Sequence, residues 1–172
     1  MRVGIVADTH GLADPGLPRA LDGCTLVLHA GDVGGPAVLE ALGRLGRVVA
    51  VRGNGDVGPF GEALPEWSVV ELGALRALVV HEAVPARPGP ALARVLARER
   101  PDLVVHGHSH RPGCARDGAR LFLNPGSAGP RRFSLPRTAA RLEVAGRRVR
   151  VEWLDLASAP PAPWRDPLDA EL

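Results

Sequence analysis

The stretch DLVVHGHSH, Asp102–His110, places a short run of leucine and β-branched residues directly before three histidines. Three other segments repeat this form: RVGIVAD ends at Asp8, TLVLHAGD ends at Asp32 and RVVAVRGNGD ends at Asp56. Each apolar run has about four to six residues, the usual length of a buried strand. Each run finishes in polar residues, most of them beside glycine. The pattern therefore predicts buried strands that end in polar side chains.

Segments of helical character separate these strands. Gly34–Gly46 has Pro36 near its start, leucines at three-residue spacing and a glycine at its end, which are signals of a helix and its boundaries. Gly16–Gly23 is a shorter candidate, and Pro90–Pro101 has an apolar face opposite its arginines. The alternation of strand and helix predicts parallel βαβ units.

The second half of the chain has a different pattern. Residues 67–82 predict two strands around Gly73, and two hairpins are predicted to turn at Asp117–Gly118 and at Gly146. We therefore expect an α/β fold, a four-layer α/β/β/α sandwich in which helices cover two packed, mixed β-sheets. Residues 1–156 would form this domain, and the Pro- and Ala-rich tail 157–172 would wrap the surface or be disordered.

The composition argues against several classes of protein. A chain of 172 residues with 45% hydrophobic residues suits one globular domain. No apolar run reaches about 18 residues, so neither a membrane span nor a membrane partner is expected, and MRVGIVADTHG reads as a first strand rather than a signal peptide. The net charge is +2, the basic residues are scattered arginines and aromatics are few, so nucleic acid is not an expected partner. Cys24 and Cys114 lie far apart, which predicts reduced thiols and a cytoplasmic protein.

Groups that can bind metal follow the predicted strands. In open α/β sheets, ligands collect beyond the carboxyl ends of the strands, so these groups should converge on one rim. Residues two apart in an extended strand face the same side, so both ends of Asp-Thr-His or His-Ser-His can reach one ion. The donors are oxygens and imidazoles without a thiolate, a set that suits Mn²⁺, Fe²⁺, Ni²⁺ or Zn²⁺. The candidate ligands are Asp8, His10, Asp32, Asn54, His81, His108 and His110.

Neighbouring residues can support such a site. The glycines at 31, 53 and 107 each precede a candidate ligand, and glycine permits a tight turn and leaves space close to a metal. His29 and His106 lie inside the strand ends, which favours structural or ligand-supporting roles.

Other polar residues keep two interpretations each. Asp56 either orients a ligand or binds solvent in a loop. Asn124 and Ser127 lie in a turn-rich loop and are interpreted as shaping it, with substrate contact as the alternative. Several arginines are candidates for holding a phosphate, although most arginines are surface residues: Arg131, Arg132 and Arg137.

The ordered motifs DTH (8–10), GD (31–32), GNGD (53–56), GHSH (107–110) and NPGS (124–127) resemble those of the calcineurin-like metallophosphoesterases. The resemblance is closest to the small YfcE-like phosphodiesterase branch and covers residues 1–155, with NPGSAGPRR as a further mark of that branch. Each motif alone is common, but the ordered set is specific.

The resemblance implies a centre of two divalent ions, with Mn²⁺ the first expectation. It assigns one ion to Asp8, His10, Asp32 and His110. It assigns the second ion to Asp32, Asn54, His81 and His108. A hydroxide between the ions would attack phosphorus in line, and the metals would neutralise the phosphoryl oxygens. The catalytic group would comprise Asp8, His10, Asp32, Asn54 and His108.

Two positions depart from the family pattern. Gly55 stands where larger members carry a histidine that assists the leaving group, which predicts better turnover of esters with good leaving groups. Glu82 and Ala83 replace the second and third residues of an HGH sequence, whose first histidine is kept as His81.

The expected activity is hydrolysis of a small phosphodiester or nucleotide-like substrate. Two alternatives stay open: a phosphomonoesterase or nucleotidase, and a non-catalytic protein-binding scaffold like a retromer subunit of the same fold. The sequence leaves the oligomeric state open, since Trp67, Trp153 and Trp164 are candidates either for an interface in a homo-oligomer or for internal packing.

Overall fold

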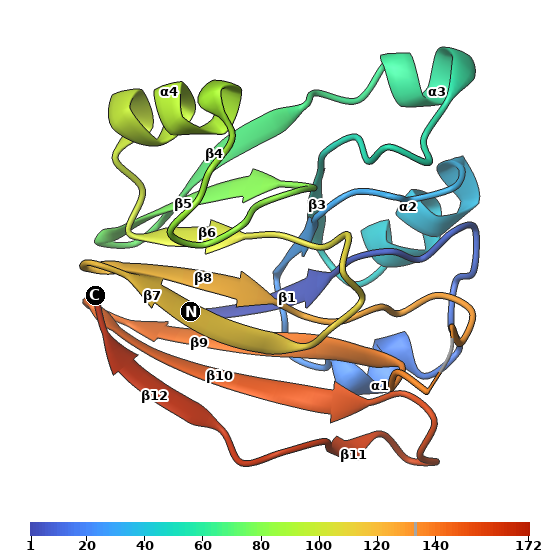
Figure 1. Cartoon of the computed structure of the whole chain (residues 1–172). Coiled ribbons are helices and arrows are strands. Elements are labelled where there is room, and N and C mark those ends of the chain that lie inside the picture. The colour runs from blue at the N-terminus through green and yellow to red at the C-terminus, as the bar shows by residue number, and fades with distance from the viewer. Residues whose placement is uncertain (133) are drawn as a thin grey trace.

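The computed structural model describes residues 1–132 and 134–172, and its strands form two mixed β-sheets (Figure 1). The first sheet has the order β11-β10-β9-β1-β2-β3, and β12 also pairs with β10. Strands β1, β2 and β3 run parallel, and the others in this sheet are antiparallel. Their bounds are Arg2–Val6 (β1), Leu26–His29 (β2), Arg47–Ala50 (β3), Thr138–Ala145 (β9), Arg148–Asp155 (β10), Ala162–Pro163 (β11) and Leu168–Glu171 (β12).

The second sheet has the order β4-β5-β6-β8-β7. Its central strands β5, β6 and β8 are parallel, and β4 and β7 add antiparallel edges. The bounds are Trp67–Leu72 (β4), Leu75–Val80 (β5), Leu103–Val105 (β6), Gly113–Asp117 (β7) and Arg120–Asn124 (β8). The predicted pair of strands around Gly73 and both predicted hairpins are present.

Four layers follow from the alternation of side chains along the strands. Inward residues such as Ile5 of β1 and Val79 of β5 share one core between the sheets. The outer face of the first sheet is covered by α1 (Leu17–Ala20) and α2 (Pro36–Gly43), and the outer face of the second sheet is covered by α4 (Pro90–Glu99). The predicted four-layer α/β/β/α sandwich is confirmed.

The helix α3 (Gly58–Glu62) is not among the predicted elements. Its sequence GPFGE is about one turn long and has no apolar repeat, so periodicity carries no signal for it. Phe60 nevertheless packs against the outer core of the first sheet.

Of the two expectations for residues 157–172, wrapping of the surface or disorder, the structure agrees with the first, because the segment lies along an edge of the first sheet. Strands β11 and β12 pair antiparallel with β10, and Val151 lies opposite Leu168. Leu168 and Ala170 pack against the core between the sheets, and Leu172 is buried. Proline is tolerated at a sheet edge, so a Pro-rich composition does not prevent this pairing.

The tryptophans differ in their surroundings. Trp153 is buried between the sheets, and its indole N–H donates to the carbonyl oxygen of Asn124 at 2.9 Å. Trp67 lies beneath the guanidinium of Arg98, while Trp164 is partly exposed. Internal packing is therefore the role of Trp153.

Across residues 1–132 and 134–172, every helix is too short or too polar to cross a membrane.

Candidate metal centre

The loops that follow β1, β2, β3, β5 and β6 bring all seven predicted ligands into one continuous group of side chains. The parallel strands of each sheet end at the same edge, and the two edges lie side by side because the sheets are packed face to face. Successive contacts of 2.9–3.9 Å link the side chains in the order Asp8, His110, His10, Asp32, His81, Asn54, His108.

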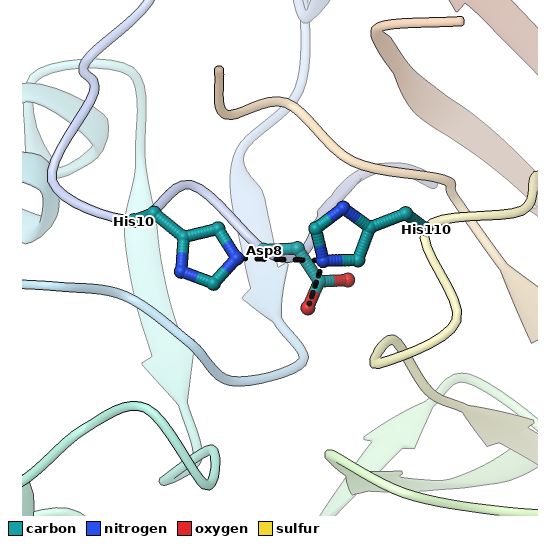
Figure 2. A group of neighbouring side chains, drawn as sticks. All are labelled: Asp8, His10 and His110. Atoms are coloured by element: carbon teal, nitrogen blue, oxygen red, sulfur yellow. Dashed lines mark hydrogen bonds and ion pairs between the residues drawn. The ribbon is translucent and has the colours of Figure 1, made fainter. Parts of the chain in front are cut away.

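Asp8, His10 and His110 form the first part of this group (Figure 2). Nε2 of His10 lies 3.4 Å from Nε2 of His110, and Nε2 of His110 lies 3.5 Å from Oδ1 of Asp8. Ligand atoms of all three residues lie within 4.8 Å of one another, close enough to hold one ion. Asp8 is fully buried at the end of β1.

Asn54, His81 and His108 form the second part. Nδ1 of His81 lies 2.8 Å from the carbonyl oxygen of Ala30, which can only accept, so Nδ1 carries the proton. The other ring nitrogen, Nε2, lies 2.9 Å from Oδ1 of Asn54. Nδ1 of His108 lies 3.0 Å from the same oxygen. Imidazole nitrogens and an amide oxygen are donors of the kind that bind divalent ions.

Asp32 lies between the two parts. Its Oδ2 is 3.9 Å from Nε2 of His10, and its Oδ1 is 3.6 Å from Nε2 of His81. The backbone N–H of Gly55 donates to Oδ1 at 2.6 Å and helps to hold the carboxylate in place. One carboxylate that offers an oxygen to each side has the geometry of a bridging ligand.

The glycines before the ligands are needed for space. A Cβ atom at Gly31 would lie 2.6 Å from Nδ1 of His81, and one at Gly107 would lie 2.8 Å from Oδ2 of Asp8. At Gly53 it would lie 2.1 Å from Oδ1 of Asp32. At each of the three glycines, the backbone therefore lies as close to a candidate ligand side chain as the sequence pattern predicts.

Replacing Gly53 by alanine should displace the Asp32 carboxylate and lower Mn²⁺ affinity by about 10–100-fold, as loss of a ligand's support typically does. The matched control is Gly43→Ala, because nothing lies within 4 Å of a Cβ at Gly43. Titration with Mn²⁺ of both variants tests this expectation. Equal affinities for the two would show that the space beside Asp32 is not required.

The backbone at the site is strained. Five of the seven predicted ligands have left-handed φ angles: Asp8 (53°), His10 (47°), Asp32 (52°), His108 (67°) and His110 (57°). This conformation costs roughly 1–2 kcal/mol per residue with a side chain and persists where surrounding contacts enforce it. The backbone of these loops is therefore locally less stable, and its conformation sets the direction of these side chains.

Asp56 supplies part of that enforcement. Its buried carboxylate accepts hydrogen bonds from the backbone N–H groups of Val33 (3.1 Å), Gly34 (2.8 Å) and Gly53 (2.9 Å). These three residues flank Asp32 and Asn54 in sequence, so one carboxylate joins the two loops that carry them. Of the two interpretations of Asp56, the contacts favour the orienting one.

His29 and His106 lie outside the chain of contacts. Thr9 Oγ1 donates to the carbonyl oxygen of Val33 at 2.9 Å and accepts from Nε2 of His29, also at 2.9 Å. Burial lowers the pKa of both histidines to about 4, which keeps them neutral. Their surroundings agree with structural or supporting roles.

The three arginines predicted as candidates for holding a phosphate differ in whether their guanidinium groups have structural partners. Arg137 forms an ion pair with Asp14 and donates from Nε to the carbonyl oxygen of Gly129 at 2.8 Å, so its guanidinium has structural partners. Arg131 and Arg132 are exposed. Arg132 lies close enough that its charge acts on Asp8, His10 and His110.

Burial sets the protonation of the first part of the group. Burial, together with the negative charge of Asp32, raises the pKa of Asp8 to about 8. Burial also lowers the pKa of His10, and that of His110 to about 4, so both imidazoles are neutral at pH 7. Asp8 therefore holds a proton at neutral pH in the absence of a cation, while the imidazoles are ready to bind one.

Metal binding should consequently release a proton from Asp8. Below pH 8 the ion must displace this proton, so Mn²⁺ affinity should fall about tenfold for each unit of pH decrease and level off above pH 8. Calorimetric titration in two buffers of different ionisation enthalpy measures the number of protons released. An affinity that is constant between pH 6 and about 8 would contradict the expectation.

The chain is similar to known proteins in sequence. A family model described as the calcineurin-like phosphoesterase superfamily domain matches residues 1–147. A probable metallophosphoesterase of Methanocaldococcus jannaschii is 35% identical over 135 residues, which cover 74% of this chain and 68% of that protein.

Two solved structures show similar folds. Wild-type Vps29 of Entamoeba histolytica, in complex with Zn²⁺, has a TM-score of 0.78 at 25% identity, covering 98% of this chain and 99% of the other. YfcE, a phosphoesterase from E. coli, has a TM-score of 0.69 at 22% identity, covering 98% of each chain.

Proposed function

Because this chain belongs to the calcineurin-like phosphoesterase superfamily, we propose that it is a phosphodiesterase that works with two divalent metal ions. The observation that carries the proposal is the unbroken series of donor side chains with the Asp32 carboxylate between its two parts. Asp8, His10, Asp32 and His110 would hold one ion, and Asp32, Asn54, His81 and His108 would hold the other.

The donor chemistry fits such ions. Carboxylate oxygens, an amide oxygen and imidazole nitrogens suit Mn²⁺, Ni²⁺, Fe²⁺ or Zn²⁺, and Mn²⁺ is the ion that the proposal places first. Vps29 of E. histolytica, whose fold is similar, has been crystallised with Zn²⁺. When bound, the ions would supply an activated water as nucleophile and neutralise charge on the phosphoryl oxygens.

The protein's own residues would orient and hold these groups. Hydrogen bonds to Ala30 and Gly55 fix His81 and the Asp32 carboxylate. His108 is exposed at the rim, where an incoming phosphate would meet it. The exposed guanidinium of Arg132 would attract that anion from the side of His10 and His110.

The lack of a side chain at Gly55 is the basis of the expectation about the substrate. The position after Asn54 offers no side chain that could protonate a leaving group, and a Cβ there would lie only 3.0 Å from Oδ1 of Asp32. Esters whose leaving groups depart without a proton, such as aryl phosphodiesters, should therefore react fastest.

The test is a substrate panel with purified, Mn²⁺-loaded protein. We expect hydrolysis of bis(4-nitrophenyl) phosphate, slower hydrolysis of 4-nitrophenyl phosphate and of nucleotides, and loss of activity with a chelator. A preference for monoesters would replace the phosphodiesterase proposal with a phosphomonoesterase or nucleotidase.

The similarity to Vps29 defines the second candidate, a protein-binding scaffold. Protein that binds two Mn²⁺ ions and hydrolyses no ester in the panel, with any divalent metal, would favour it. The complete set of donors favours the enzyme instead. The proposal also includes a cytoplasmic location, which the free thiols of Cys24 and Cys114 support.

A further inference from the structure

The NPGS motif has no part in the proposed chemistry, yet it lies where the chain passes from one sheet of the site to the other. Asn124 is the last residue of β8 in the second sheet, and the chain enters β9 of the first sheet at Thr138. The loops of the second sheet carry His81, His108 and His110, and those of the first sheet carry Asp8, His10, Asp32 and Asn54. The segment 124–129, called here the bridging loop, therefore connects the two sets of ligands.

The side chain of Asn124 holds the loop that carries His108 and His110. Its Nδ2 donates to the carbonyl oxygen of Gly107 at 2.8 Å and to Oγ of Ser109 at 3.1 Å. Its Oδ1 accepts from the backbone N–H of Gly126 at 2.9 Å. Asn124 is only 3% exposed, so these polar atoms have no access to water as an alternative partner.

The side chain of Ser127 holds the loop that carries Asp8. Its hydroxyl donates to the carbonyl oxygen of Asp8 at 2.9 Å and accepts from the N–H of Gly129 at 3.2 Å. A Cβ at Gly129 would lie 2.3 Å from that carbonyl oxygen, so the bridging loop packs directly on the Asp8 backbone. These contacts help to enforce the left-handed φ of 53° at Asp8.

The bridging loop is itself anchored on the first sheet. Thr138 Oγ1 donates to the carbonyl oxygen of Pro125 at 2.7 Å, and the backbone N–H of Thr138 donates to the carbonyl oxygen of Ser127 at 2.8 Å. The indole of Trp153 on β10 donates to the carbonyl oxygen of Asn124. Because the loop is bonded to both sheets, it fixes one sheet's ligands relative to the other's.

We propose that Asn124 and Ser127 are positioning residues, which together set the separation between the ligands of the two sheets. The critical spacing is the 3.5 Å between Nε2 of His110 and Oδ1 of Asp8, which come from different sheets. This inference rests on the two-ion part of the proposed function and concerns metal binding alone, so it is testable without hydrolysis.

The experiment compares Mn²⁺ binding by the full-length protein and two variants. Asn124→Asp keeps the shape and the acceptor for Gly126 but removes both N–H donors, and Ser127→Ala removes the hydroxyl. Each should weaken Mn²⁺ binding by about 10–100-fold, the usual cost of losing a group that orients a metal ligand. Each should also reduce the spin-coupled Mn²⁺ pair signal in electron paramagnetic resonance spectra, since that signal depends on the distance between the ions.

Thr138→Val is the matched control, because Thr138 donates an equally buried hydroxyl to the same loop but bonds to neither ligand loop. It should lower the melting temperature and leave Mn²⁺ affinity within about twofold of the parent's, since only the ligand-orienting contacts carry the larger cost. Thermal unfolding without metal identifies variants that fail to fold. Should Asn124→Asp fail, Ser109→Ala removes one of the same contacts at an exposed residue.

Each result bears on the inference. Parental affinity and pair signal in both variants would overturn it, as would equal losses in Thr138→Val, which would mean that general loosening of the loop is the cause. A parent protein that binds no Mn²⁺ pair would overturn this inference together with the two-ion proposal. Loss of the pair signal in the variants of a parent that binds two ions but hydrolyses nothing would support the inference and sink only the proposed function.

Discussion

Replacing Asp32 by asparagine is expected to lower the kcat/KM of the Mn²⁺-loaded protein by about 10³-fold or more. The Asp32 carboxylate faces His10 with one oxygen and His81 with the other, so it is placed to neutralise two cations at once. Asparagine keeps the shape and an oxygen for the N–H of Gly55, but it removes the negative charge. Two dications would then repel each other without an anion between them.

Two measurements separate this effect from misfolding. Mn²⁺ stoichiometry should fall below two, whereas the melting temperature without metal should stay close to the parent's, because asparagine keeps the shape of the side chain and an oxygen for the N–H of Gly55. Asp22→Asn is the matched control, since Asp22 is exposed in the turn after α1. Parental activity in Asp32→Asn with two bound ions would refute the bridging role.

Replacing His81 by alanine is expected to reduce Mn²⁺ stoichiometry from two to one and to lower kcat by about 10²-fold or more, because the metals contribute several kcal/mol of transition-state stabilisation. Nε2 of His81 faces both Asn54 and Asp32, while Asp8, His10 and His110 can hold the other ion without it. With a single ion, the protein would lose the second ion's contribution to activating the water and to neutralising charge on the phosphate.

Chemical rescue sharpens the test at His81. The substitution leaves a space of the size of the lost ring beside the carbonyl oxygen of Ala30, so added imidazole should restore part of the activity and the second ion. Glu82→Ala is the control, because Glu82 is exposed and adjacent in sequence. Two tightly bound ions in His81→Ala would exclude His81 as a ligand.

The sequence predicted the elements with clear periodicity and missed those without it. The β-branched runs became β1, β2, β3 and β6, and the hairpin turns at Gly118 and Gly146 are where the pattern placed them. The short helix α3 and the edge strand β12 were missed because neither has a local pattern. Both depend on surfaces that other parts of the chain provide: α3 on the outer core of the first sheet, and β12 on the exposed edge of β10.

The candidate site shows the same division. Which residue types follow the strands is visible in sequence, because residue order and the need for glycine beside a bulky side chain are local properties. The expectation that residues two apart face one side of an extended strand is wrong here, since Asp8, His10, His108 and His110 have left-handed φ angles. How those residues pair is not visible in sequence, since Nε2 of His10 meets that of His110 across 100 positions of the chain. The NPGS motif was conspicuous in sequence, yet the contact from Ser127 to Asp8 spans 119 positions.

The candidate ligands can be read from the sequence alone: oxygen and imidazole groups at strand ends, with glycines beside them, in the order of a known superfamily. Their arrangement depends on the folded chain, which places Asp32 between two groups, gives Asp8 and His110 a left-handed backbone and bonds the bridging loop to both sheets. The difference is one of range. Strand alternation and glycine sterics act between neighbours in sequence, whereas the packing of two sheets sets distances between residues that no local pattern relates.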